Sequence, residues 1–170
     1  LSYAPLFIDR EVAVIGEGEL AQRSTAELAT VAKHATLICP TDSLPITAVT
    51  QRLKAANNVT ILTGHQVVDV KGDDYAKSLV VRDRQGKTTE LPAEGTFVEM
   101  ALVPNSQIVA DFVALDEQKR IIIDCGNHTS VPGIFAAGDV TNTYAEQVLV
   151  AVGEGAKAAL SAYDYLLTLP

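Results

Sequence analysis

The chain of 170 residues is 48% hydrophobic, enough for a buried core in one compact domain or in one domain with an appendage. Its 21 acidic residues outnumber its 13 lysines and arginines and give a formal net charge of −8. This charge argues against nucleic acid or an anionic membrane as the main partner. No apolar run approaches the roughly 20 residues of a membrane-spanning helix, and no secretory leader opens the chain. We therefore expect a soluble, cytoplasmic protein.

Short apolar runs alternate with helical patterns in the first third of the chain. Strands are expected at 11–15, 35–39 and 59–63, and helices at 20–33 and 45–56. This βαβαβ order predicts a parallel sheet with right-handed crossovers.

The hydrophobic period then changes to two. The runs 67–70, 78–82 and 87–91 are separated by polar turns and predict an antiparallel meander. Residues 96–100 should return to the parallel sheet, and the Pro104-Asn105 break marks a boundary between two regions. We thus expect an α/β, Rossmann-like three-layer domain. Beyond the break, the sequence predicts an amphipathic piece at 108–115, strands at 120–124 and 134–137, and a long helix at 145–167.

The first strand and helix are joined by Gly16-Glu-Gly-Glu-Leu-Ala21, which has the GxGxxA form of a dinucleotide-binding turn. Gly16 allows the tight turn, Gly18 lets the backbone approach a pyrophosphate, and Ala21 permits close contact between helix and strand. With Glu19 at the helix start, these residues form a candidate nucleotide site at a helix N-terminus. The alternative is a tight turn that binds nothing.

Neighbouring residues depart from the usual pattern of such a site. Glu17 brings a carboxylate beside the expected pyrophosphate, and Cys39 stands where an acidic ribose-binding residue is expected. Asp42 could reach a ribose diol, although a turn or capping role is the simpler interpretation. Because no arginine occupies this loop to meet a 2′-phosphate, NAD is favoured over NADP.

A second candidate dinucleotide contact lies in the segment Ser130-Val-Pro-Gly-Ile-Phe-Ala-Ala-Gly-Asp139. A strand that ends in Gly138-Asp139 can present a backbone amide and a carboxylate to a dinucleotide. Gln147 and a Gly- and Ala-rich helix follow it. The small residues of that helix are equally compatible with ordinary close packing.

Together, residues 12–21, 97–106 and 121–167 resemble thioredoxin reductase-like pyridine nucleotide-disulfide oxidoreductases, most closely the flavoprotein subunits of alkyl hydroperoxide reductase. The resemblance implies an NAD(P)-binding domain at 9–101. It also implies that 102–170 form the C-terminal part of a second, FAD-type α/β domain.

The resemblance also implies cofactor contacts. Gly138 and Asp139 would lie near the flavin pyrophosphate and ribitol, and the helix start at Gln147, Val148 and Ala151 would face the isoalloxazine ring. Ala101 stands where the family commonly has glycine close to the nucleotide. A hydride would pass from NAD(P)H to FAD, and electrons then to a redox partner protein; a homodimer is compatible with this chemistry.

The family's CxxC disulfide and its first FAD-binding half are not found in this sequence. Residues 1–7 resemble the junction before the nucleotide domain, without the Cys-containing segment that the family has there, and Cys39 and Cys125 match no redox or metal spacing. The three histidines likewise lack metal-ligand spacing. Three hypotheses remain open: part of a thioredoxin reductase-like flavoprotein, a ferredoxin-NAD(P) reductase-like flavoenzyme without CxxC, or a non-catalytic nucleotide-binding or interaction module.

Overall fold

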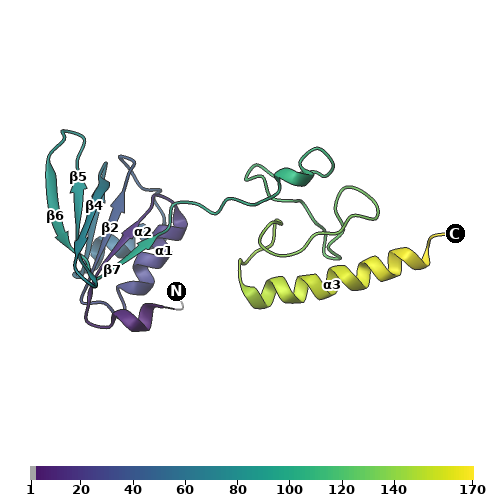
Figure 1. Ribbon diagram of the computed structural model, residues 1–170, viewed down its shortest axis with the longest axis horizontal. Coiled ribbons are helices and arrows are strands. Elements are labelled where there is room, and N and C mark those ends of the chain that lie inside the picture. Colours follow the sequence, from purple (N-terminus) through teal and green to yellow (C-terminus); the bar gives the residue numbers. More distant parts are fainter. Residues whose placement is uncertain (1–2) are drawn as a thin grey trace. The chain divides into compact units, whose positions relative to one another are not determined.

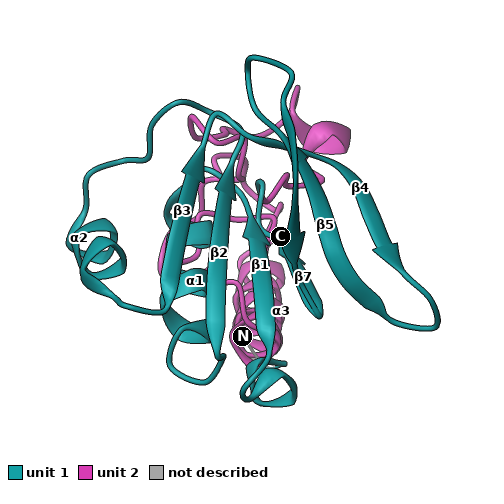
Figure 2. Ribbon diagram, turned by 90° about the vertical axis from the view of Figure 1, so that its left-hand side faces the viewer, with its two compact units in different colours: residues 1–101 teal, residues 102–170 magenta. Residues whose placement is uncertain are grey.

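A computed structural model describes residues 3–170, and the chain forms two compact units (Figure 1). Unit 1 is Leu1–Ala101 and unit 2 is Leu102–Pro170, coloured separately in Figure 2. Leu1 and Ser2, which belong to the segment compared with the family's redox junction, lie outside the described residues. No helix within residues 3–170 is long and apolar enough to cross a membrane.

Unit 1 contains a parallel sheet with the strand order β3-β2-β1-β7, and β3, β2 and β1 stand side by side in Figure 2. Its strands are β1 (Glu11–Ile15), β2 (His34–Cys39), β3 (Val59–Thr63) and β7 (Gly95–Val98). The helices are α1 (Glu19–Leu28) and α2 (Ala48–Ala55), and the 3-10 helix η1 (Ala4–Phe7) precedes β1. The predicted βαβαβ order and the return of the chain through β7 are confirmed.

A second, antiparallel sheet in unit 1 has the order β4-β5-β6. Its strands are β4 (Gln66–Gly72), β5 (Ala76–Arg82) and β6 (Thr88–Pro92). Leu79 and Val81 of β5 share a buried cluster with Ala13 and Ile38 of the parallel sheet. Val12 and Val14, which alternate with Ala13 along β1, pack instead in a cluster with residues of α1 and α2. The predicted three layers are thus confirmed: helices, parallel sheet and antiparallel sheet.

Both helices of unit 1 are shorter than the periodicity predicts. After Leu28 the chain tightens, because the amide of Val31 donates to the Leu28 carbonyl at 3.0 Å, and it then turns into β2. At α2, Thr47 caps the helix: its hydroxyl accepts from the Thr50 amide at 3.1 Å, and the Thr50 hydroxyl accepts from the Thr47 amide at 3.3 Å. Residues 45–47 therefore belong to the loop after β2.

Unit 2 contains one long helix, α3 (Val148–Leu167), and the 3-10 helix η2 (Gln107–Val109). The amphipathic piece expected at 108–115 forms no further helix within the described residues. The prediction of strands at 120–124 and 134–137 is wrong. Isolated bridges such as Ile121↔Thr141 and His128↔Phe135 replace them. Ile134, expected in a buried strand, is 37% exposed.

The strand predictions failed because an apolar run becomes a strand only where a neighbouring strand completes its hydrogen bonds. In unit 2 side chains take part in the hydrogen bonds of backbone amides and carbonyls. The amide of Ile123, for example, donates to the side-chain oxygen of Asn142 at 3.0 Å. Asn127 donates from its side chain to the Ala136 carbonyl at 2.8 Å.

Gln22 of α1 holds the loop after β2 in place and provides a test of this packing. It is fully buried, and its Oε1 accepts from the hydroxyls of Thr47 and Thr50, both at 2.8 Å. Gln22→Leu is expected to lower the free energy of unfolding by about 1–3 kcal/mol, because the half-buried Thr47 hydroxyl and the buried Thr50 hydroxyl lose the Gln22 oxygen as an acceptor. Urea denaturation followed by circular dichroism measures this change.

Gln51→Leu on the exposed face of α2 is the matched control. It should change the free energy of unfolding by no more than about 0.5 kcal/mol. Equal stability of the two variants would contradict a structural role for the Gln22 network.

Candidate functional site

Gly16 lies where three elements of unit 1 meet. Its amide donates to the carbonyl of Ile38 in β2 at 3.0 Å. A Cβ at this position would lie 2.2 Å from the backbone oxygen of Glu99 and 2.6 Å from the Cβ of Ala21. Even alanine is therefore too large here without a backbone shift. Ala21 is fully buried, as expected for the residue that lets α1 approach the sheet.

Gly18 has the opposite surroundings. It is the N-cap of α1 with ordinary extended backbone angles, and a Cβ built on it would meet nothing within 4 Å. The open space borders the first turn of α1, where unpaired amides and the helix dipole favour an anion. The turn thus has the free approach that a pyrophosphate requires.

Two predicted neighbours of this turn are carboxylates. Glu19 is exposed in the first turn of α1, and its Oε2 lies 3.9 Å from Arg23. Glu17 is half-buried. A third carboxylate, missed in the sequence, is that of Glu99 just after β7, which accepts from the Ser24 hydroxyl at 3.0 Å. Ser24 holds the Glu99 side chain against α1.

The loop after β2 differs from the sequence interpretation. Cys39 is buried, and its Sγ lies 3.1 Å from the Thr41 hydroxyl, so its side chain points inward. Asp42 is not a cap: its Oδ1 forms an ion pair with Nε of Arg84 at 2.6 Å. Arg84 comes from the turn after β5, so an arginine does reach this loop, although none lies within it. The absence of a local arginine therefore no longer argues for NAD.

In unit 2 the structure brings two of the candidate flavin-binding residues, Gly138 and Ala151, into contact. Gly138 has φ +78°, and a Cβ on it would lie 3.2 Å from the Cβ of Ala151 on α3. Its amide donates to Oε2 of Glu154 at 2.9 Å, while the Thr143 hydroxyl donates to Oε1 at 2.7 Å. Glu154, which the sequence did not single out, thus fastens the Gly138-Asp139 turn to α3.

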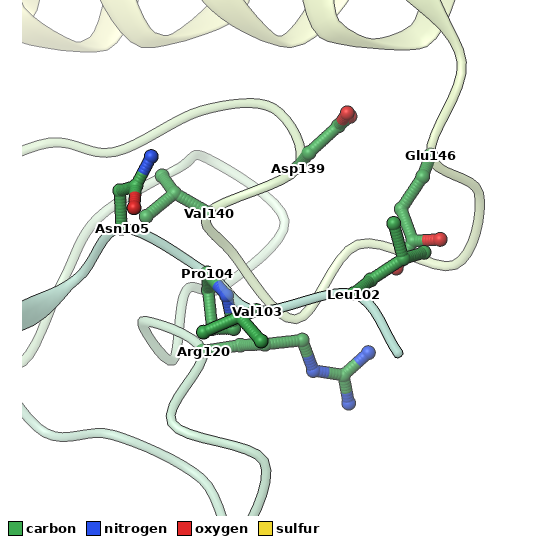
Figure 3. A pocket seen from close by; sticks show the side chains of 8 residues that line it. All are labelled: Leu102, Val103, Pro104, Asn105, Arg120, Asp139, Val140 and Glu146. Atoms are coloured by element: carbon green, nitrogen blue, oxygen red, sulfur yellow. The ribbon is translucent and has the colours of Figure 1, made fainter. Parts of the chain in front are cut away.

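Asp139 itself is exposed and borders a cavity of about 260 Å³ within unit 2 (Figure 3). The lining residues are Leu102, Val103, Pro104, Asn105, Arg120, Asp139, Val140 and Glu146. Arg120 is held by Asp116, with Nε to Oδ2 at 2.8 Å. The cavity wall therefore carries the carboxylates of Asp139 and Glu146 and the guanidinium of Arg120, groups that can bind a polar ligand.

The start of α3 presents Gln147 as the N-cap without a side-chain capping bond, followed by the exposed Val148. None of the 20 residues of α3 is buried. Leucines, valines and tyrosines are exposed along it, so unit 2 by itself leaves an apolar helix face uncovered.

In unit 2, hydrogen bonds from His128 affect the titration of Asp124. Hydrogen bonds from the His128 amide and ring, at 2.9 and 3.0 Å, hold the pKa of the Asp124 carboxyl below its usual range. The fold therefore gains stability from ionised Asp124 above the pKa of an unfolded aspartate. This gain is lost as the pH falls through the lowered value.

The structure brings the sequence-predicted residues together in two groups. Gly16, Gly18, Glu19 and Ala21 meet at the start of α1, while Ala101 is exposed at the end of unit 1. Gly138 and Ala151 adjoin in unit 2. Within residues 3–170, no group of three or more His, Cys, Asp or Glu could hold a metal ion.

Comparison with known proteins identifies the family of the chain. A family model described as "Pyridine nucleotide-disulphide oxidoreductase" matches residues 3–155. An alkyl hydroperoxide reductase subunit of Staphylococcus aureus is 40% identical over 165 residues, 96% of this chain and 32% of that protein. The subunit of the same name from Xanthomonas campestris pv. phaseoli is 42% identical over 166 residues, 96% of this chain and 31% of that protein.

Among solved structures, thioredoxin reductase of Streptococcus pyogenes matches with a TM-score of 0.88 at 29% identity, over 98% of this chain and 56% of that one. The chain spans about a third of the length of the two alkyl hydroperoxide reductase subunits. Because the family model covers most of the chain and a relative at 40% identity covers 96% of it, the chain belongs to the pyridine nucleotide-disulphide oxidoreductase family.

Proposed function

We propose that this chain is the NAD(P)-binding domain, residues 9–101, and the C-terminal part of the FAD-binding domain, residues 102–170, of a flavoprotein oxidoreductase. The observation that carries the proposal is the open approach to Gly18 at the start of α1. There the free amides of the helix would hold the pyrophosphate of NADH or NADPH. Family membership supports the same reaction, hydride transfer from NAD(P)H to FAD.

The flavin half of the proposal rests on unit 2. When bound, FAD supplies the acceptor for the hydride. The Gly138 turn would hold the polar chain of the cofactor, with Asp139 beside it. The amides at the start of α3, near Gln147, would face negative charge that develops on the reduced ring. Because α3 exposes an apolar face, we propose that another segment of polypeptide covers it and completes this site.

The electron acceptor is proposed to be a redox partner protein. Cys39 is buried and Cys125 exposed, and both are free thiols. We therefore propose that no disulfide chemistry takes place within this chain. A cytoplasmic location and a homodimer complete the proposal, together with a preference for NAD over NADP that rests on Asp42 in the loop after β2.

The nucleotide site is tested by Gly18→Asp. Aspartate is a good N-cap, so the helix should be as stable as with glycine or more stable. The added carboxylate would repel the pyrophosphate. NADH binding, measured by isothermal titration calorimetry on the 170-residue chain, is expected to weaken at least about tenfold.

Gly16→Ala is the matched control, because its Cβ would clash with the Glu99 carbonyl. It should lower the melting temperature, whereas Gly18→Asp should not. Nucleotide binding that survives Gly18→Asp unchanged would contradict the proposed site.

The flavin site is tested in a fusion that places the N-terminal part of the S. aureus relative before this chain. The fusion is expected to bind FAD, seen as visible flavin absorbance, while the unfused chain binds it far more weakly. Glu154→Ala removes the acceptor of the Gly138 amide and should reduce FAD affinity about tenfold.

Asp164→Ala, an exposed acidic residue elsewhere on α3, should leave FAD affinity unchanged. A folded fusion without FAD, or equal FAD affinity of the Glu154 and Asp164 variants, would count against the proposed role of unit 2.

A further inference from the structure

Asp42 and Arg84 form an ion pair that joins the two sheets of unit 1 at the end of β2. Asp42 lies three residues after β2, and Arg84 lies in the turn between β5 and β6. Oδ1 of Asp42 and Nε of Arg84 are 2.6 Å apart. Because β1 and β2 are parallel neighbours, the loop that carries Asp42 follows β2 at the same sheet edge at which Gly16 follows β1. Dinucleotide-binding domains meet the adenosine ribose at this edge.

The backbone around the pair is fixed. The amide of Gly64, just after β3, donates to the Thr41 carbonyl at 2.8 Å, and that of His65 donates to the Cys39 carbonyl at 3.1 Å. Gly64 has φ +66°, and a Cβ on it would lie 3.0 Å from Oδ1 of Asp42. The loop thus carries Asp42 at a defined position, and the glycine leaves space for the pair.

Only one oxygen and one nitrogen are engaged in the pair. The side chains of Asp42 and Arg84 are 63% and 59% exposed, and neither makes another polar contact with a described residue. Oδ2 of Asp42 remains available as an acceptor, and the terminal nitrogens of Arg84 remain available as donors. Arg84 also lines a hollow beside Pro40 and Gln66, together with Arg82 and the carboxylate of Asp83.

We propose that this pair determines which nicotinamide nucleotide the proposed site accepts. Asp42 favours NADH because its free oxygen accepts from a ribose hydroxyl, whereas a 2′-phosphate, with a charge of about −1.5 to −2, is repelled. Arg84 holds Asp42 in position and is itself kept from the phosphate by Asp42. The inference rests on the proposed function, since it assigns a specificity to that nucleotide site.

The two charges have opposite consequences once they are separated. Without the Asp42 charge, the guanidinium of Arg84 is free to bind a phosphate through several N–H donors, a geometry in which arginine excels. Without Arg84, Asp42 still repels a phosphate but loses its fixed position. A change at Asp42 should therefore depend on Arg84, which distinguishes this arrangement from a general effect of charge.

The experiment compares NADH and NADPH binding, each measured by fluorescence titration of the reduced nucleotide on the 170-residue chain. The wild-type chain is expected to bind NADH more tightly than NADPH. Asp42→Asn should lower the ratio of the NADPH to the NADH dissociation constant at least about tenfold. In the Asp42→Asn, Arg84→Gln double variant most of this gain should be lost, a coupling that a double-mutant cycle quantifies.

Asp74→Asn and Arg52→Gln are the matched controls, because they make the same charge changes at exposed positions of unit 1 outside this loop. They should leave the ratio within about twofold of wild type. A ratio that Asp42→Asn leaves unchanged, or that Asp74→Asn changes equally, overturns the inference while the proposed function stands. Absence of saturable binding of both nucleotides to the wild-type chain overturns the proposed function and the inference together.

Discussion

The nucleotide edge of unit 1 depends on how closely the backbone after β7 approaches Gly16. The Glu99 carbonyl occupies the space that a Cβ of residue 16 would need, at 2.2 Å. The Glu99 amide meanwhile donates to the Ile15 carbonyl at 2.7 Å. Three parallel strands therefore end around one residue without a side chain. This closeness directs the chain into α1 with its first amides free, which is what an anion-binding turn requires.

Unit 2 is held together differently. Its buried apolar side chains within the described residues are only Val113 and Ile121, and α3 buries none. Glu154 and Asn127 instead connect its loops through hydrogen bonds. A helix that exposes valines, leucines and tyrosines gains little from the hydrophobic effect until something covers it. The order of the Gly138 turn accordingly depends on a few polar bonds more than on a core.

Sequence patterns predicted unit 1 well. β1 and β2 are buried on both faces and read as short apolar runs. The strand Val59–Thr63 has the bounds that the pattern predicts. The run 120–124 is equally apolar but lacks a neighbouring strand, and apolar character alone cannot supply one. The ion pair between Arg84 and Asp42 was not predicted, for a related reason. Arg84 reaches Asp42 only because the antiparallel sheet packs on the parallel one.

The acidic composition of the chain does not oppose an anionic ligand, because charges more than about 8 Å away are largely screened at physiological ionic strength. What matters is how the nearest carboxylates are held. Glu99 accepts from Ser24, and Asp42 is paired with Arg84. Glu19 sits in the first turn of α1, where it stabilises the helix but competes with a pyrophosphate for the same positive dipole end. Its approach to Arg23 moderates that competition, so the backbone amides at Gly18 remain the principal attraction for a nucleotide.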